Sequence, residues 1–332
     1  HSTSRRQRQM CIRDSVKAIP GAPDELLSRA GYLADRVSIN LELPTAQSLS
    51  KLAPNKSFKT ILEPMEKITG TIAANRLALG KDARMERSSI NRYLTGSIFN
   101  QNGTDNGQAA LSGTQRTALE SGDKLSLPAV SKDMCVKRPF APAGQSTQMI
   151  IGATPETDLT LIRTTQHLYK NYDLKRVFYS AYIPLNEDSA LPQLDADVPL
   201  LREHRLYQAD WLLRFYGFQA DELLSESRPN FNEQLDPKCD WAIRHLGQFP
   251  VEVQNASYDM LLRIPGIGPK SARRIVETRR YAKLDFDILK KIGVVLKRAH
   301  YFITCNGRMM YRIPIEESYI TCLLYTSDAA DD

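Results

Sequence analysis

Hydrophobic and polar positions follow a strand and helix rhythm from residue 15 onward. A short apolar run ends at a Pro-Gly turn, and residues 22–34 then carry leucines and alanines at helical spacing. Residues 35–44 alternate apolar and polar side chains, as a half-buried strand does. The positions predicted to point inward from this strand are Val37, Ile39 and Leu41. Thr45 follows as the predicted N-cap of another helix.

The same rhythm returns after a long polar stretch. Residues from about 85 to about 135 are rich in Ser, Asn, Gly and Thr, and this composition predicts a surface insertion or a disordered loop. An apolar strand is then predicted at 147–153, a helix at 155–172 and another strand at 176–185. Strands that are separated by helices indicate a parallel sheet, either open or curled into a barrel.

The C-terminal half is predicted to be helical, and both ends of the chain lack a periodic pattern. A long helix is predicted to end at Gly217, and further helical pieces are interrupted at Pro229 and Pro237. Residues 1–14 and the last residues resemble translated adaptor read-through, so we leave them out of the predicted fold. The resulting division has a βα region at 15–200, a helical bridge at 201–250, a basic domain at 251–304 and a tail at 305–332.

Charge is concentrated in one segment of the chain. Residues 251–300 contain eleven Lys or Arg against five Asp or Glu, and this excess of six equals the net charge of the whole protein. A positive field that is confined to one segment is typical of a nucleic-acid-binding surface. The alternative is a solvated helix face, which is the ordinary interpretation of a charge run without a motif beside it.

The cysteines predict neither disulfides nor a local metal site. They stand at positions 11, 135, 239, 305 and 322, and no two are closer than 17 residues. This spacing, together with the absence of an apolar run long enough to span a membrane, predicts a cytoplasmic protein.

A Pro-Gly-Ile-Gly-Pro segment lies inside the basic region. Pro265 is predicted to end one helix and Pro269 to begin the next. Gly266 and Gly268 are predicted to adopt backbone conformations that other residues disfavour, and Ile267 to fill the core beneath the turn. Such a turn points free backbone N–H groups and a helix N-terminus outward, which makes an anion site. The residues predicted to contact a phosphate are Gly266, Ile267, Gly268, Lys270, Ser271, Arg273 and Arg274.

This segment resembles the helix-hairpin-helix family. The resemblance implies that main-chain amides hold a DNA backbone phosphate without reading sequence. Residues 279–302 resemble a second, degenerate copy, with Gly293 in its hairpin and no second glycine, so its own phosphate contact is left open. A tight corner between helices, or a hairpin that contacts protein, is the alternative.

The βα region carries a second resemblance. Residues 39–45, 149–158 and 178–185 are similar to three strand segments of radical S-adenosylmethionine enzymes, and residues 15–304 as a whole resemble the DNA modification/repair radical SAM proteins. The resemblance implies an incomplete radical-SAM-type (β/α) barrel followed by an all-α helix-hairpin-helix domain. It also implies that Asn40 and Glu42 contact S-adenosylmethionine and that Gly152 leaves room for its adenine. Two polar residues at a strand end without any ligand are the alternative, and Glu156 is predicted to cap the next helix.

The motif that binds the iron–sulfur cluster in that family is missing here. The family carries Cys-x-x-x-Cys-x-x-Cys, whose three thiolates hold a [4Fe–4S] cluster with one iron open to the cofactor. In this sequence Cys11 lies in the excluded end, and no other cysteine has a partner three or four residues away. We therefore expect the chain to be a fragment that cannot assemble the cluster, and the catalytic residues are unknown.

Three functions are compatible with these observations. The first is a fragment of a radical SAM enzyme that modifies or repairs DNA by generating a 5′-deoxyadenosyl radical. The second is a non-catalytic helix-hairpin-helix DNA-binding protein. The third is a helix-hairpin-helix glycosylase, for which Asp285 and Asp287, 15 and 17 residues after Lys270, are the candidate aspartates, although the residues around them do not match that family.

Overall fold

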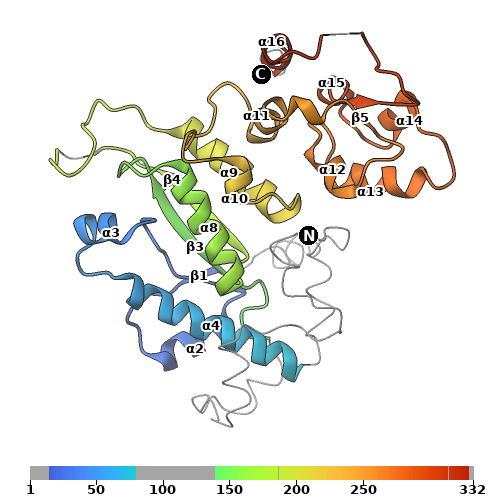
Figure 1. The fold of residues 1–332 in the computed structure, drawn as a ribbon. Coiled ribbons are helices and arrows are strands. Elements are labelled where there is room, and N and C mark those ends of the chain that lie inside the picture. The colour runs from blue at the N-terminus through green and yellow to red at the C-terminus, as the bar shows by residue number, and fades with distance from the viewer. Residues whose placement is uncertain (1–14, 80–138, 186, 313, 329–332) are drawn as a thin grey trace, which may run out of the picture. The chain divides into compact units, whose positions relative to one another are not determined.

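The structure is a computed structural model, and its described residues fall into two compact units (Figure 1). The described residues are 15–79, 139–185, 187–312 and 314–328. The first unit takes its described residues from 15–79, 139–156 and 167–203, and the second from 157–166 and 204–328. None of the described helices is long and apolar enough to span a membrane.

A parallel sheet forms the centre of the first unit. Its strands are β1 (Ser15–Lys17), β2 (Arg36–Ser38), β3 (Gln145–Ile151) and β4 (Arg176–Ala181). They pair in the order β1-β2-β3-β4, and every pair is parallel. The predicted parallel sheet is therefore confirmed. The described strands do not close on themselves, so the barrel stays a prediction.

The two faces of this sheet differ in polarity. One face carries apolar side chains that are almost completely buried: Val37, Ile39, Leu41, Met149, Ile151, Val177 and Tyr179. The alternate positions carry mostly polar side chains, which include Ser38, Asn40, Ser146, Gln148, Arg176 and Ser180. Parallel sheets usually have two apolar faces, because helices cover both of them. A second face that carries mostly polar side chains is therefore unusual for a parallel sheet.

Helices of the first unit complete its core. They are α2 (Asp24–Leu33), α3 (Ala46–Leu52), α4 (Phe58–Ala78) and parts of α8 (Asp158–Tyr172) and α9 (Leu200–Phe215). Thr45 caps α3, as its position predicted. We did not predict α4, although it begins with a Ser57–Thr60 capping box. The side-chain amide of Gln145 in β3 donates to the Met65 carbonyl of α4 at 3.0 Å, which fixes this helix against the sheet.

The second unit contains short helices and a small sheet. Its helices are α10 (Ala220–Leu223), α11 (Pro237–Arg244), the 3-10 helix η1 (Leu246–Gln248), α12 (Tyr258–Arg263), α13 (Pro269–Thr278), α14 (Phe286–Lys291), α15 (Leu296–Ala299) and α16 (Glu317–Asp328), and parts of α8 and α9 belong to it as well. Pro237 begins α11 rather than interrupting a helix, because Asp236 caps that end. Ile320 and Leu324 of α16 are buried, although our prediction left part of this segment out of the fold.

The prediction of an all-α domain around the hairpin was wrong. Strands β5 (Val251–Glu252) and β6 (Ile303–Thr304) form a parallel pair. The carboxylate of Glu252 accepts hydrogen bonds from the Thr304 hydroxyl at 3.0 Å and from the backbone N–H of Asn306 and Gly307 at 3.2 and 2.8 Å. These bonds hold the two strands together. Each strand has only two residues, which is too short to be predicted from an alternating pattern.

Candidate nucleic-acid interface

The first hairpin, residues 264–268, joins α12 to α13. Pro265 follows the end of α12 and Pro269 is the first residue of α13, as predicted. Gly266 has a φ of +79°, and a Cβ at this position would overlap the carbonyl oxygen of Val295. Only glycine therefore fits there. Gly268 has a φ of −97°, which any residue can adopt, so the prediction that its conformation requires glycine was wrong.

Backbone donors are available at the start of α13. None of the described residues accepts a hydrogen bond from the main-chain N–H groups of Gly268, Lys270 or Ser271. The first N–H groups of a helix have no acceptor inside the helix, and they attract anions together with the helix dipole. Lys270, Arg273 and Arg274 are exposed on the same helix. The start of α13 thus combines main-chain donors with positive side chains.

A second hairpin, residues 292–295 between α14 and α15, packs against the first. Gly293 has a φ of +93°, and the Val295 N–H donates to the Gly266 carbonyl at 2.9 Å. The Ser271 hydroxyl donates to the Gly293 carbonyl at 2.6 Å, and Arg274 donates to the Ile292 carbonyl at 3.0 Å. Two of the predicted phosphate contacts therefore also hold the hairpins together with their side chains.

The positive charges of this segment divide into two groups. Eight of the eleven basic residues are exposed: Lys270, Arg273, Arg274, Arg280, Lys283, Lys290, Lys291 and Lys297. The other three are half-buried and bond inside the protein, as Arg274 of the exposed group also does. Arg263 pairs with Glu222, Arg298 pairs with Asp236, and Arg279 donates to the Ala256 carbonyl at 2.5 Å. The sequence could not distinguish these groups, because the partners of Arg263 and Arg298 lie more than 40 residues away.

Lys238 and Tyr216 lie beneath the first hairpin and were not identified from the sequence. Ile267 fills the core, and its backbone carbonyl accepts a hydrogen bond from the buried Lys238 ammonium at 2.6 Å. The ammonium also lies 4.6 Å from the centre of the Tyr216 ring. Burial lowers the pKa of Lys238 to about 7, and the charge of Asp236 acts in the opposite direction. No sequence motif marks either residue.

Comparison with known proteins agrees with this geometry. The helix-hairpin-helix motif model matches residues 251–278, which include β5, α12, the first hairpin and α13. No curated protein and no solved structure matches the chain. The matched motif suggests nucleic-acid binding by the second unit.

The three residues predicted to contact S-adenosylmethionine lie near the C-terminal ends of β2 and β3. The Asn40 amide donates to Gln148 at 3.2 Å, and Glu42 pairs with Lys56 at 3.1 Å. Gly152 has a φ of +84°, and a Cβ there would lie 2.7 Å from Pro199. Each of the three thus has a neighbour within the first unit, and their contact with a cofactor stays a prediction.

Glu156 does not cap the helix that follows it. The hydroxyl of Thr157 accepts from the backbone N–H of Thr160 at the start of α8 instead. The Glu156 carboxylate accepts a hydrogen bond from the Thr45 hydroxyl at 2.9 Å. Burial raises its pKa, but hydrogen bonds from Ser48, Thr154 and Thr45 outweigh that effect, so the pKa is lowered. Glu156 therefore joins the two loops that follow β2 and β3.

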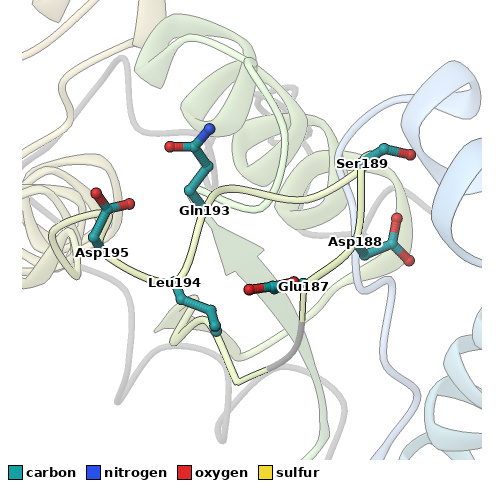
Figure 2. Close-up of a pocket in the computed structure, with 6 residues that line it drawn as sticks. All are labelled: Glu187, Asp188, Ser189, Gln193, Leu194 and Asp195. Carbon is teal, nitrogen blue, oxygen red and sulfur yellow. The ribbon is translucent and has the colours of Figure 1, made fainter.

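Other candidate sites in the described residues lack the features of a metal or phosphate site. No group of three or more His, Cys, Asp or Glu side chains is placed to hold a metal ion in this part of the chain. A hollow in the loop after β4 is lined by Glu187, Asp188, Ser189, Gln193, Leu194 and Asp195 (Figure 2). Three of these six residues are acidic, and their charges disfavour a nucleic-acid phosphate.

The glycosylase alternative receives no support from its two candidate aspartates. Asp285 is the N-cap of α14 and accepts from the Ile288 N–H at 2.7 Å. Asp287 lies in the first turn of the same helix, where a negative charge stabilises the helix dipole. The two positions thus have a structural explanation.

Proposed function

We propose that the second unit binds duplex DNA through its phosphate backbone, without reading base sequence. The observation that supports this most strongly is the start of α13, where the N–H groups of Gly268, Lys270 and Ser271 have no acceptor among the described residues. A phosphate oxygen is the acceptor that such a group of donors fits, because it accepts several hydrogen bonds and its charge is stabilised by the helix dipole.

The surrounding charge supports the same proposal. Lys270, Arg273 and Arg274 are exposed at the start and on the side of α13, and five further exposed basic residues follow between 280 and 297. Backbone phosphates recur regularly along a duplex, so a surface with several positive side chains meets more than one of them. Contacts of this kind orient a protein on DNA but carry no sequence information.

Lys270→Ala is expected to weaken duplex binding through one lost phosphate contact. The slope of log affinity against log salt concentration is expected to fall in magnitude by about 1, because each neutralised phosphate releases about one counterion. Fluorescence anisotropy with a labelled duplex at four or five salt concentrations measures this slope. Lys51→Ala is the matched control, since Lys51 is an exposed lysine of α3 in the first unit. Equal slopes for wild type and Lys270→Ala would contradict the phosphate contact.

As a second candidate, we propose that the first unit is part of a radical-SAM-type barrel from an enzyme that acts on DNA. The sequential order of its four parallel strands is what an arc of a (β/α) barrel has. Asn40, Glu42 and Gly152 also come near the C-terminal ends of neighbouring strands, where such barrels bind ligands.

The residues present do not fit an iron–sulfur cluster. The sequence lacks the Cys-x-x-x-Cys-x-x-Cys motif, and Cys239, Cys305 and Cys322 of the described residues are far apart in sequence. We therefore derive no chemical step that involves this cluster or S-adenosylmethionine.

The radical SAM proposal is tested by the gene upstream of residue 15. We expect it to encode the three-cysteine motif, and the longer protein to gain iron–sulfur absorbance on anaerobic reconstitution. On reduction with dithionite that protein is expected to release 5′-deoxyadenosine from S-adenosylmethionine. An upstream sequence without the motif, or a reconstituted protein without 5′-deoxyadenosine release, would remove this candidate and leave a non-catalytic DNA-binding protein.

A further inference from the structure

We propose that Lys238 is a positioning residue of the phosphate site, which acts on the phosphate through the peptide group between Ile267 and Gly268. The inference rests on the proposed DNA-binding function. It concerns a side chain that contacts the first hairpin from inside the protein and has no access to DNA itself.

One peptide group connects Lys238 to the phosphate site. The Lys238 ammonium donates to the Ile267 carbonyl at 2.6 Å, and this oxygen belongs to the same peptide group as the Gly268 N–H. The peptide bond is trans, since the only cis bond among the described residues joins Phe249 to Pro250. In a trans peptide the C=O and N–H bonds point in opposite directions. Lys238 on the inner side thus directs the Gly268 N–H outward.

The buried charge also strengthens the outward donor. A hydrogen bond to a carbonyl polarises its peptide group and makes the attached N–H a better donor, most strongly where the dielectric constant is low. Lys238 is only 9% exposed. The ammonium lies roughly 8 Å from a phosphate oxygen bound to the Gly268 N–H, by standard bond and hydrogen-bond lengths. At that distance the two opposite charges attract each other without contact.

The same arrangement predicts that Lys238 takes up a proton when DNA binds. Burial lowers the pKa of Lys238 to about 7, so a large part of the free protein carries a neutral Lys238 at neutral pH. A bound phosphate favours the charged form and raises this pKa, and DNA binding therefore takes up a proton. By linkage, duplex affinity is constant well below pH 7 and falls as the pH rises through the interval between the free and the bound pKa.

Some groups around Lys238 raise its pKa and others lower it. Asp236 and Cys239 favour its charged form, while Arg263 and Arg298 disfavour it. Tyr216 presents its ring face to the ammonium. Asp236 is also paired with Arg298 at 3.0 Å, which reduces the field that it exerts on Lys238. The charged and titratable groups that face Lys238 are therefore Asp236, Cys239, Arg263, Arg298 and Tyr216.

The test measures the affinity of a labelled duplex between about pH 6 and about pH 9 at constant salt, for wild type, Lys238→Met and Lys270→Ala. Wild-type affinity is expected to fall about tenfold over this range, which corresponds to a pKa raised by about one unit on binding. Lys238→Met is expected to lose most of this pH dependence and to keep the wild-type salt slope. Lys270→Ala is expected to keep the pH dependence and to lose part of the salt slope. Other pH effects are common to all three proteins and cancel in the comparison.

Each outcome leads to a separate conclusion. A wild-type protein that does not bind duplex DNA overturns the proposed function. Binding with the same pH dependence in wild type and Lys238→Met overturns the role of Lys238 alone. If Lys238→Met does not fold, as judged by circular dichroism, wild-type binding heats near pH 7.5 in buffers of different ionisation enthalpy give the number of protons exchanged. Proton uptake supports the inference, and no uptake or proton release contradicts it.

Discussion

Replacing Gly266 by alanine is expected to lower the free energy of unfolding of the second unit by about 3 kcal/mol. Two costs contribute. The φ of +79° lies in the left-handed region, which is strained for a residue with a side chain. The new Cβ would also overlap the backbone carbonyl of Val295, which cannot move freely because the Val295 N–H is bonded to Gly266. We expect duplex affinity to fall about tenfold or more, because the shift moves the N–H groups of the first hairpin.

Gly293→Ala is the control that separates the cost of a positive φ from the cost of the overlap with Val295. Gly293 has a φ of +93°, but a Cβ there would lie 3.7 Å from its nearest neighbours, which is ordinary contact. This variant is expected to lose only about 1 kcal/mol. Denaturant titration followed by tryptophan fluorescence reports on the second unit, because Trp211 and Trp241 both belong to it. Equal losses for the two variants would show that the overlap with Val295 costs nothing.

Replacing Arg263 by methionine is expected to destabilise the protein by about 3 kcal/mol and to leave the salt slope of DNA binding unchanged. The guanidinium donates to both carboxylate oxygens of Glu222 at 2.8 and 2.9 Å and to the Tyr216 carbonyl at 3.1 Å. It also lies 4.2 Å from the centre of the Phe218 ring. Its side chain is 15% exposed, so methionine leaves a partly buried carboxylate and a carbonyl without their donor.

Arg280→Met is the matched control for Arg263→Met. Arg280 is exposed after the end of α13, and its loss is expected to change stability by less than about 0.5 kcal/mol. The double variant Arg263→Met with Glu222→Ala is expected to recover part of the loss, since the unpaired carboxylate is then removed as well. If Arg263→Met retained full stability but reduced the salt slope, Arg263 would be a DNA contact and its structural role would be refuted.

Local signals in the sequence were sufficient for much of the fold. The alternation of Val37, Ile39 and Leu41 identified a buried strand, because side chains in a strand point alternately to the two faces. Pro265 and Pro269 located the hairpin, because proline restricts the backbone within one or two residues of itself. Helix α4 was not predicted, although the helical spacing of Ile61, Met65, Ile68 and Ile72 is a local signal of the same kind.

The candidate interface was only partly predictable. Lys270, Arg273 and Arg274 were identified because a motif and a charge excess coincide around them. The same reasoning included Arg263 and Arg298, whose side chains bond inside the protein. Composition counts charges without regard to burial, and burial depends on partners that the tertiary structure supplies.

The sequence by itself determined where the helices meet at the first hairpin, that the strands are parallel, and that positive charge gathers around one helix. The hairpin and the charge depend on residues within a few positions of one another, so their physical causes are visible in short windows. The parallel strands follow from the alternation of strand and helix signals along the chain. Only the tertiary structure decided that Gly266 rather than Gly268 requires its glycine conformation, and that Lys238 lies beneath the phosphate site. Lys238 and Ile267 are 29 residues apart, and a contact over that separation forms only when packing brings its two ends together.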